Sequence, residues 1–436
     1  MTVTMSIIGM ILAIAVLIVL MMKGVNQFLA ILCASMTAIL FGGLNIHDAL
    51  TGAFMSGLTG YIKSYFFMFL WGALLSVFME VSGGACAIAK LLMKVMKSWT
   101  WVAIPIATGL LAYGGVFAIA ATFPVIPIAR AVFQENDIPR RLMPGMLYFG
   151  CGTCFMVAPG SVQVQNIVPA SEFGLSRTCG FVGGWIGALS MLVIGLIWLR
   201  FMIRKEKALG HHWTDDQQHN AEERPLPHPL LALLPLIITV AAINLPDGSG
   251  GNLLPMETAV FIGDLSCLIL LFWYFKWREL TSHFAKAASN TISTIFSISA
   301  IVGFGSVIKA TPGFAVLSDL IVRIPGTYLI GAALGTALIC GFCGSASGGL
   351  GIAAPIFHKI YSVMPGVDLS AVSRIMSLAS CSLDSAPHSG AVTAIISLCG
   401  ETHRESYLPV FYLSVVTPLI GTAIGILVFT LFPGLP

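Results

Sequence analysis

The sequence predicts an all-α polytopic membrane protein made of two inverted-topology repeats, each with about five transmembrane helices, a re-entrant hairpin and a broken helix. Three observations support this fold class: the composition, an apolar pattern that occurs twice, and polar breaks at matching places in both copies. Of the 436 residues, 57% are hydrophobic and 9% are charged, whereas a soluble domain carries roughly 25% charged residues. Apolar runs of about 20 residues, long enough to cross a lipid bilayer, recur along the chain.

A hydrophilic stretch at residues 204–228 separates a first membrane repeat, 1–203, from a second, 229–436. Its lysines and arginines indicate a cytoplasmic linker, because cytoplasmic loops carry an excess of both residues. In each repeat the fourth apolar segment is overlong and contains glycines, which predicts a hairpin, and the fifth contains a polar motif with proline, which predicts a broken helix. The segments lie at 5–22, 25–43, 64–82, 100–135, 141–170 and 174–203, and again at 229–246, 256–276, 290–309, 326–361, 369–400 and 405–433.

Basic residues also indicate how the repeats are oriented. Lys23, Arg140 and Arg141 lie in the cytoplasm if the first hairpin enters the membrane from that side. Each repeat then crosses the membrane an odd number of times, so the second repeat is inverted relative to the first. Three basic residues fall on the outer side, against the rule: Lys309, Arg323 and Lys359.

The polar breaks indicate a transporter, because inverted repeats with discontinuous helices place a substrate site where the breaks meet. Free N–H groups and the positive ends of half-helices favour an anion, and Ser, Asn and Gln side chains suit a carboxylate with hydroxyl groups. The alternative for any single Gly/Ser motif is a face for close helix packing. The substrate-binding candidates are Gly114 and Gly115 in the first hairpin; Thr153, Ser161, Gln163 and Asn166 in the first broken helix; Gly344, Ser345, Ala346, Ser347, Gly348 and Gly349 in the second hairpin; and Ser385, His388 and Ser389 in the second broken helix.

Three ionisable residues inside apolar segments are candidates for ion coupling: Asp384, His388 and Asp264. A carboxylate within the membrane is costly unless it binds a cation, a proton or a partner. His388 either titrates near neutral pH or donates to a backbone carbonyl. Arg374, at the start of the second broken helix, either counters a substrate carboxylate or anchors the end of its segment.

Several other functions are disfavoured. The two CxxC spacings, Cys151 to Cys154 and Cys340 to Cys343, lack flanking histidines or carboxylates, so we expect neither a metal site nor a cofactor. The chain has no basic patch for nucleic acid. "CGSASGGLG" lacks the Gly-Lys-Ser/Thr end of a phosphate loop, and its serine lies in no nucleophile elbow. We therefore expect that the protein is not an enzyme.

Two motifs carry a family resemblance. "GSASGGLGI", residues 344–352, followed by "SCSLDSAPHSGAVTAIISLCGETHRESY", residues 380–407, resembles the gluconate permease family of GntP-type gluconate:H+ symporters, within the ion transporter superfamily. The motifs look closest to hydroxybutyrate-type or citrate-type branches. The resemblance implies substrate-site roles for residues 344–349 and 384–389.

The resemblance also implies proton-coupled symport of a small hydroxylated carboxylate, such as gluconate, glycerate or 3-hydroxybutyrate, across the bacterial inner membrane. It further implies an elevator-type movement within a homodimer. The breaks contain no extra arginines for a highly charged substrate, which favours a monocarboxylate over citrate. A sodium-coupled carboxylate or citrate transporter, a channel and a membrane-embedded enzyme remain the alternatives, and proton or sodium remains the coupling ion.

Overall fold

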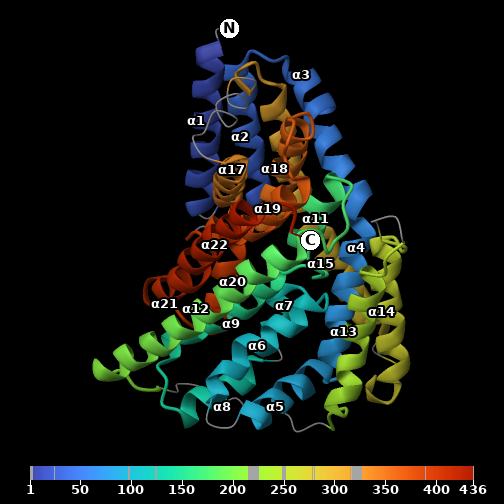
Figure 1. Ribbon diagram of the computed structural model, residues 1–436, viewed down its shortest axis with the longest axis vertical. Coiled ribbons are helices and arrows are strands. Elements are labelled where there is room, and N and C mark those ends of the chain that lie inside the picture. The colour runs from blue at the N-terminus through green and yellow to red at the C-terminus, as the bar shows by residue number, and fades with distance from the viewer. Residues whose placement is uncertain are drawn as a thin grey trace.

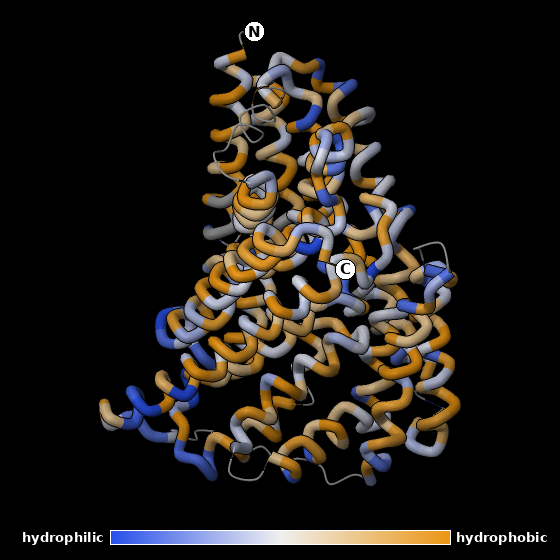
Figure 2. Tube along the Cα trace, in the orientation of Figure 1, coloured by the Kyte–Doolittle hydropathy of each residue, from blue (hydrophilic) through white to orange (hydrophobic). Residues whose placement is uncertain are grey.

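The computed structural model describes residues 3–23, 25–96, 99–122, 125–214, 225–247, 252–276, 278, 280–314, 316, 327–387 and 389–435. These residues are almost entirely helical (Figure 1), and the described ranges contain no β-strand, only an isolated bridge between Pro246 and Asn252. Hydrophobic residues predominate along the helices, and hydrophilic residues gather at the far end of α12, at the lower left of Figure 2. The expected all-α class is therefore confirmed.

The helices of the first half follow the order of the apolar segments. They are α1 (Val3–Met22), α2 (Gln27–Gly42), α3 (Ile46–Asp48), α4 (Met55–Val81), α5 (Gly84–Met96), α6 (Thr100–Tyr113), α7 (Ala118–Thr122), α8 (Ile126–Glu135), α9 (Met143–Gly152), α10 (Cys154–Val157), α11 (Val164–Glu172) and α12 (Phe181–Ala208). A π-helical turn, Ala49–Phe54, joins α3 to α4.

The second half repeats this order. Its helices are α13 (Pro229–Ile243), α14 (Met256–Leu270), α15 (Leu280–Ala310), α17 (Tyr328–Cys343), α18 (Ala346–Tyr361), α19 (Leu369–Leu383), α20 (Gly390–Leu398), α21 (His403–Phe411) and α22 (Thr417–Leu431). Helices α6 to α8 correspond to the hairpin α17–α18, and α9 to α11 correspond to α19 and α20. The hairpin α17–α18 lies in the upper half of Figure 1, whereas α5, α6 and α8 lie at the lower end. The inversion of the second half relative to the first stays a prediction.

Four helices are long and apolar enough to cross a membrane: Ile46–Val81, Phe181–Ala208, Leu280–Ala310 and His403–Leu431. They occupy the third and sixth places of each half. The long helix in the third place of each half, Ile46–Val81 or Leu280–Ala310, is longer than the segment predicted there, 64–82 or 290–309. Serine, threonine, glycine and lysine in their first turns lower the local hydropathy, but the helix continues because α4 packs along α15.

Local sequence explains where several helices begin. Asn26 Oδ1 accepts the backbone N–H of Phe28 at 3.0 Å, and Asp368 Oδ1 accepts those of Ser370 and Ala371 at 2.9 and 3.1 Å. Each cap satisfies donors that the first turn of a helix leaves without a partner. Asp368 thereby fixes the start of α19, the helix that carries Arg374 and is directly followed by Asp384.

Small residues let the long helices approach closely. An added Cβ at Gly421 of α22 would lie 2.9 Å from the carbonyl oxygen of Gly187 on α12. Such contacts are typical of membrane helices, which associate through packing because lipid offers no hydrophobic driving force between them. The pair α12–α22, like the pair α4–α15, therefore joins the first half to the second.

Of the predicted linker 204–228, residues 204–208 continue α12 and residues 215–224 lie outside the described residues. Residues 205–213 are fixed to the loop after α8: Lys207 donates to the Asn136 carbonyl at 2.6 Å, and Arg141 pairs with Glu206. The division of the chain into two repeats and a cytoplasmic linker at these boundaries stays a prediction.

Candidate functional site

The first hairpin turns at Gly114 and Gly115, and Gly115 has a φ of +110° that favours glycine. The Gln163 side chain closes this tip, because its Nε2 donates to the carbonyl oxygens of Ala112 and, at 3.1 Å, Val116. Two of the predicted breaks therefore meet, as the sequence indicates. The amide of Gln163 satisfies carbonyls that a broken helix leaves open.

The first broken helix is held against this tip by Tyr113, whose hydroxyl donates to the Pro159 carbonyl at 3.0 Å. Thr153, with φ −130° and ψ −114°, interrupts the helix between α9 and α10. Ser161 is fully buried, and its hydroxyl accepts the backbone N–H of Gln163 at 3.3 Å. Most polar groups of this break are therefore engaged with the protein's own backbone.

The second hairpin turns at Gly344, which directly follows α17 and has a left-handed φ of +58°. Ser345 caps α18: its hydroxyl accepts the backbone N–H of Gly348 at 3.3 Å and lies 3.2 Å from the hydroxyl of Ser347. An added Cβ at Gly349 would lie 2.5 Å from the backbone of α17, so the hairpin arms touch there. The glycines thus serve close packing as well as the turn.

Asp384 directly follows α19 as its C-terminal cap residue, and it is 4% exposed. The Ser385 hydroxyl donates to Asp384 Oδ1 at 3.0 Å, and the backbone amide of Ala346, the first residue of α18, also donates to the carboxylate. The carboxylate therefore lies at the positive end of α18, where the second hairpin meets the second broken helix. Ser389, the residue directly before α20, is also buried. His388 lies outside the described residues.

Arg374 joins the two broken helices. It is fully buried, and its Nη1 donates to Asn166 Oδ1 at 2.7 Å and to the Val157 carbonyl at 3.2 Å, while its Nη2 donates to the Cys179 carbonyl at 2.7 Å. Asn166 in turn donates to the Ser161 carbonyl at 2.8 Å. Among the described residues, no carboxylate pairs with this guanidinium. Arg374 thus anchors backbone carbonyls of the first half to α19.

Asp264 lies on α14 and is 2% exposed, and neither of its carboxylate oxygens has a hydrogen-bond partner among the described residues. Helix α14 packs against α13 and α4, away from Asp384. Val260, one turn earlier, lines a small cleft together with Gly115 and Gln163. The structure therefore places the two predicted coupling aspartates near different hairpins.

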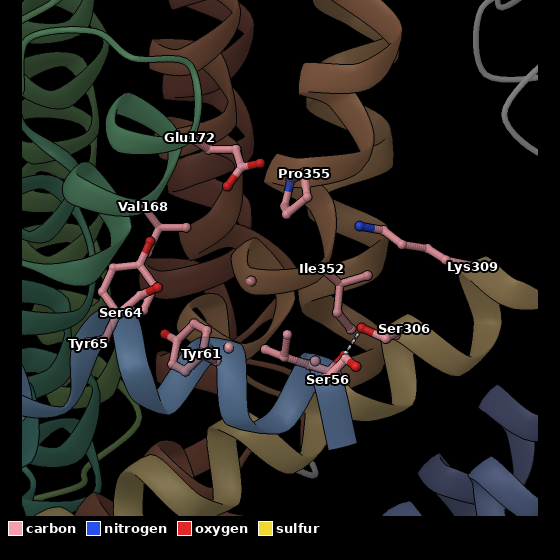
Figure 3. Close-up of a pocket in the computed structure, with 15 residues that line it drawn as sticks. Ser56, Tyr61, Ser64, Tyr65, Val168, Glu172, Ser306, Lys309, Ile352 and Pro355 are labelled. Atoms are coloured by element: carbon pink, nitrogen blue, oxygen red, sulfur yellow. Dashed lines mark hydrogen bonds between the residues drawn. The ribbon is translucent and has the colours of Figure 1, made fainter. Parts of the chain in front are cut away.

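A larger cavity, of about 240 Å³, lies between α4, α11, α15 and α18, and we call it the α4–α15 cavity (Figure 3). The predicted site residues do not line it. Its polar and small lining residues include Gly60, Tyr61, Ser64, Glu172, Ser306 and Lys309. The cavity thus borders the second arm of the second hairpin, α18, and the second part of the first broken helix, α11.

The chemistry of this cavity is set by hydroxyls and two opposite charges. Tyr61 is 5% exposed, its ring centroid lies 4.7 Å from that of Tyr65, and its hydroxyl has no hydrogen-bond partner among the described residues. Lys309 of α15 and Glu172 of α11 face the cavity from different sides in Figure 3 without forming a salt bridge. Glu172 Oε1 instead lies 3.8 Å from His358 Nδ1.

Hydropathy alone does not reveal this cavity, because its polar residues occur singly within apolar helices. The signal that was available is their spacing: Ser56, Gly60, Tyr61 and Ser64 recur at intervals of about one helical turn. Such spacing places small and polar side chains on one face of α4, the face that looks across to α15 and α18.

The proteins similar to this chain include two curated proteins and several solved structures, two of which are described below. An uncharacterized transporter, YxjC of Bacillus subtilis strain 168, is 29% identical, with 94% of this chain and 96% of that protein covered. An uncharacterized permease of Haemophilus influenzae is 22% identical, with 86% of this chain and 82% of that protein covered.

The YdaH transporter of Alcanivorax borkumensis, described as having an unusual topology, matches with a TM-score of 0.56 at 17% identity, over 88% of this chain and 89% of that one. MtrF of Neisseria gonorrhoeae, assigned to a class of antimetabolite efflux pumps, matches with a TM-score of 0.54 at 15% identity, over 90% of this chain and 85% of that one. These likenesses establish the fold of a polytopic transporter. The GntP family permease model matches residues 5–385, nearly the whole chain, and the protein therefore belongs to the GntP permease family.

Proposed function

We propose that this permease is a secondary active transporter that couples proton movement to symport of a small hydroxylated monocarboxylate across the bacterial inner membrane. Gluconate, glycerate and 3-hydroxybutyrate represent the substrate class. The observation that carries the proposal is the position of Asp384, a buried carboxylate at the first residue of α18, where the second hairpin meets the second broken helix.

The charge of Asp384 and the position of the hairpin tip are coupled in this arrangement. An ionised carboxylate is attracted to the N-terminal end of α18 and accepts from Ser385 and Ala346. A protonated carboxyl group loses most of this attraction, because it carries no net charge. Proton binding therefore weakens the contact between the hairpin tip and α19.

This coupling supports an elevator-type cycle. The hairpins and the broken helices move relative to the long helices α4 and α15, which pack along one another, when Asp384 is neutral and substrate is bound between the two groups of helices. Moving a neutralised carboxyl group through the membrane avoids the cost of transferring a bare charge.

The test is uptake by proteoliposomes that contain the purified full-length protein. Radiolabelled gluconate, glycerate, 3-hydroxybutyrate, lactate and citrate are each offered with an inward proton gradient, an inward sodium gradient or no gradient. We expect one of the monocarboxylates to accumulate only under the proton gradient. Asp384→Asn should abolish this accumulation and retain exchange of labelled for unlabelled substrate.

The control is Asp48→Asn, which changes an exposed aspartate in α3 and should leave accumulation unchanged. If accumulation requires a sodium gradient and not a proton gradient, the coupling ion is sodium. If citrate alone accumulates, the substrate is citrate and not a monocarboxylate. If no acid accumulates under either gradient, the symporter assignment is wrong, and uptake that only dissipates a gradient would identify a channel.

A further inference from the structure

We propose that the α4–α15 cavity is the binding site for the transported acid on the outer side of the membrane, with Lys309 binding the carboxylate and the hydroxyl of Tyr61 binding a substrate hydroxyl. This inference rests on the proposed function and assigns its substrate site to residues outside the four breaks. It names the substrate as a small monocarboxylate that carries hydroxyl groups.

The first support is a buried polar group without a partner. Buried hydroxyls in proteins nearly always have a hydrogen-bond partner, and a buried tyrosine usually finds one for its O–H. Tyr61 is 5% exposed and lines the cavity, and within the described part of the chain its hydroxyl has no hydrogen-bond partner. A ligand hydroxyl or carboxylate in the cavity would supply it.

The second support is the charge. Lys309 lines the cavity, and no carboxylate of the described residues forms an ion pair with it. Glu172 and, to a smaller extent, the second cation Lys359 on α18 lie close enough to act on the charge of Lys309. Both lysines violate the positive-inside rule in the predicted topology. Cations at the mouth of an outward-facing cavity attract an anion, which accounts for this violation.

The third support concerns selectivity. Glu172 faces Lys309 across the cavity (Figure 3), so a second carboxylate on the substrate would meet a like charge. The hydroxyls of Ser64 and Ser306 line the same space and match a hydroxylated chain. The volume, about 240 Å³, lies below the roughly 300–1,000 Å³ of pockets for drug-sized ligands, so the site fits a small acid.

Two glycines of the continuous helix Ile46–Val81 allow a matched test: Gly60 in α4 and Gly52 in the π-helical turn before α4. A Cβ added at Gly60, which lines the cavity, or at Gly52, which does not, would meet nothing within 4 Å. Both residues are exposed and belong to the same continuous helix. Gly60→Leu should therefore fill the cavity, whereas Gly52→Leu should add the same side chain elsewhere, and neither should disturb helix packing.

The experiment has two readouts on the purified full-length protein in detergent and in proteoliposomes. Equilibrium binding of labelled gluconate, glycerate, 3-hydroxybutyrate, lactate and citrate is measured first, followed by the KM and Vmax of uptake under a proton gradient. We expect Lys309→Gln to weaken binding at least tenfold and raise KM, and Lys309→Arg to restore most of both. Tyr61→Phe should weaken binding several-fold, and Gly60→Leu should abolish it while Gly52→Leu binds like the wild type.

The outcomes separate this proposal from the proposed function. If an acid binds but never accumulates, and Gly60→Leu and Lys309→Gln abolish the binding, the cavity assignment stands and the symporter assignment fails. If an acid accumulates with the same KM in the wild type, Gly60→Leu and Lys309→Gln, the symporter stands and the cavity is not its site. Absence of binding by all five acids also overturns the cavity assignment, and equal binding of citrate overturns the choice of a monocarboxylate.

Discussion

Arg374 Nη1 donates to Asn166 Oδ1 across 2.7 Å, and this hydrogen bond joins the second broken helix to the first. The two residues are 208 positions apart in the sequence and both are fully buried. A buried cation with no carboxylate partner persists only where other oxygens surround it. The carbonyls of Val157 and Cys179 supply these oxygens, so Arg374 fixes the relative position of the two breaks.

Replacing Arg374 by methionine is expected to destabilise the fold. The substitution removes the side-chain donors to the buried carbonyl of Val157 and the half-buried carbonyl of Cys179, and the loss of a donor to a buried group costs about 1–3 kcal/mol. We expect a loss of about 3 kcal/mol or more, seen as a lower melting temperature and less monodisperse protein in size-exclusion chromatography. Arg200→Met, which changes an exposed arginine of α12, is the control. A stable Arg374→Met variant with a raised KM would show instead that Arg374 binds the substrate carboxylate.

The Gln163 amide is expected to stabilise the first hairpin. Gln163→Leu removes the donors to the carbonyls of Ala112 and Val116 and should cost about 1–3 kcal/mol. Thermal unfolding measured by intrinsic fluorescence checks this, with the exposed Gln134→Leu on α8 as the control. Unchanged stability together with weaker substrate binding would favour the direct role in binding that the sequence analysis assigns to Gln163.

The pKa of Asp137 predicts how acid affects the contact between the segment that follows α12 and the loop after α8. The His212 hydrogen bond, more than the backbone N–H of Trp213, lowers the pKa of Asp137 below its usual range. The contact is therefore fully present above the unfolded-state pKa of about 3.9 and is lost as the pH falls through the lower pKa of the folded protein.

Asp137→Asn tests this contact at neutral pH without disturbing the backbone. Asp137 has a φ of +49°, and asparagine adopts this left-handed conformation about as readily as aspartate. We expect faster hydrogen exchange at the Trp213 amide in the variant, and the same rate in the wild type once the pH falls below the lowered pKa of Asp137. Glu135→Gln, an exposed change in the neighbouring α8, should have no effect. Equal exchange in Asp137→Asn and the wild type would contradict the stabilising role of the charge.

Much of the fold follows from the sequence because length and glycine position are strong signals in a membrane. The overlong segments 100–135 and 326–361 do turn at Gly115 and Gly344, whose positive φ angles glycine adopts without strain. The first turns of α4 and α15 were not predicted, because hydropathy measures transfer into lipid, and serine, threonine, glycine and lysine lower it there although the helix continues.

The candidate site, like the fold, could be predicted from the sequence only in part. The four breaks meet in pairs, as their order in the sequence indicates, yet the side chains of Gln163 and Asn166 hydrogen-bond to the protein itself. The use of a hydrogen-bonding group depends on tertiary neighbours that a sequence does not display. The α4–α15 cavity depends on four helices from different parts of the chain, so only the spacing of Ser56, Gly60 and Ser64 pointed to it. The role of each predicted residue in transport stays a prediction.

Asp264→Leu is expected to raise the melting temperature. Both carboxylate oxygens of Asp264 are buried without a partner among the described residues, and removing such a group recovers a desolvation penalty of about 1–3 kcal/mol. Ser266→Leu on the same helix is the control, because the Ser266 hydroxyl already donates to the Gly263 carbonyl at 2.7 Å and its loss should give no such gain. Both variants are compared with the wild type by thermal unfolding and by gradient-driven uptake. A lower melting temperature for Asp264→Leu would show that the carboxylate has a partner in the folded protein. Higher stability with lost accumulation and retained exchange would make Asp264, beside the first hairpin, a second coupling residue alongside Asp384.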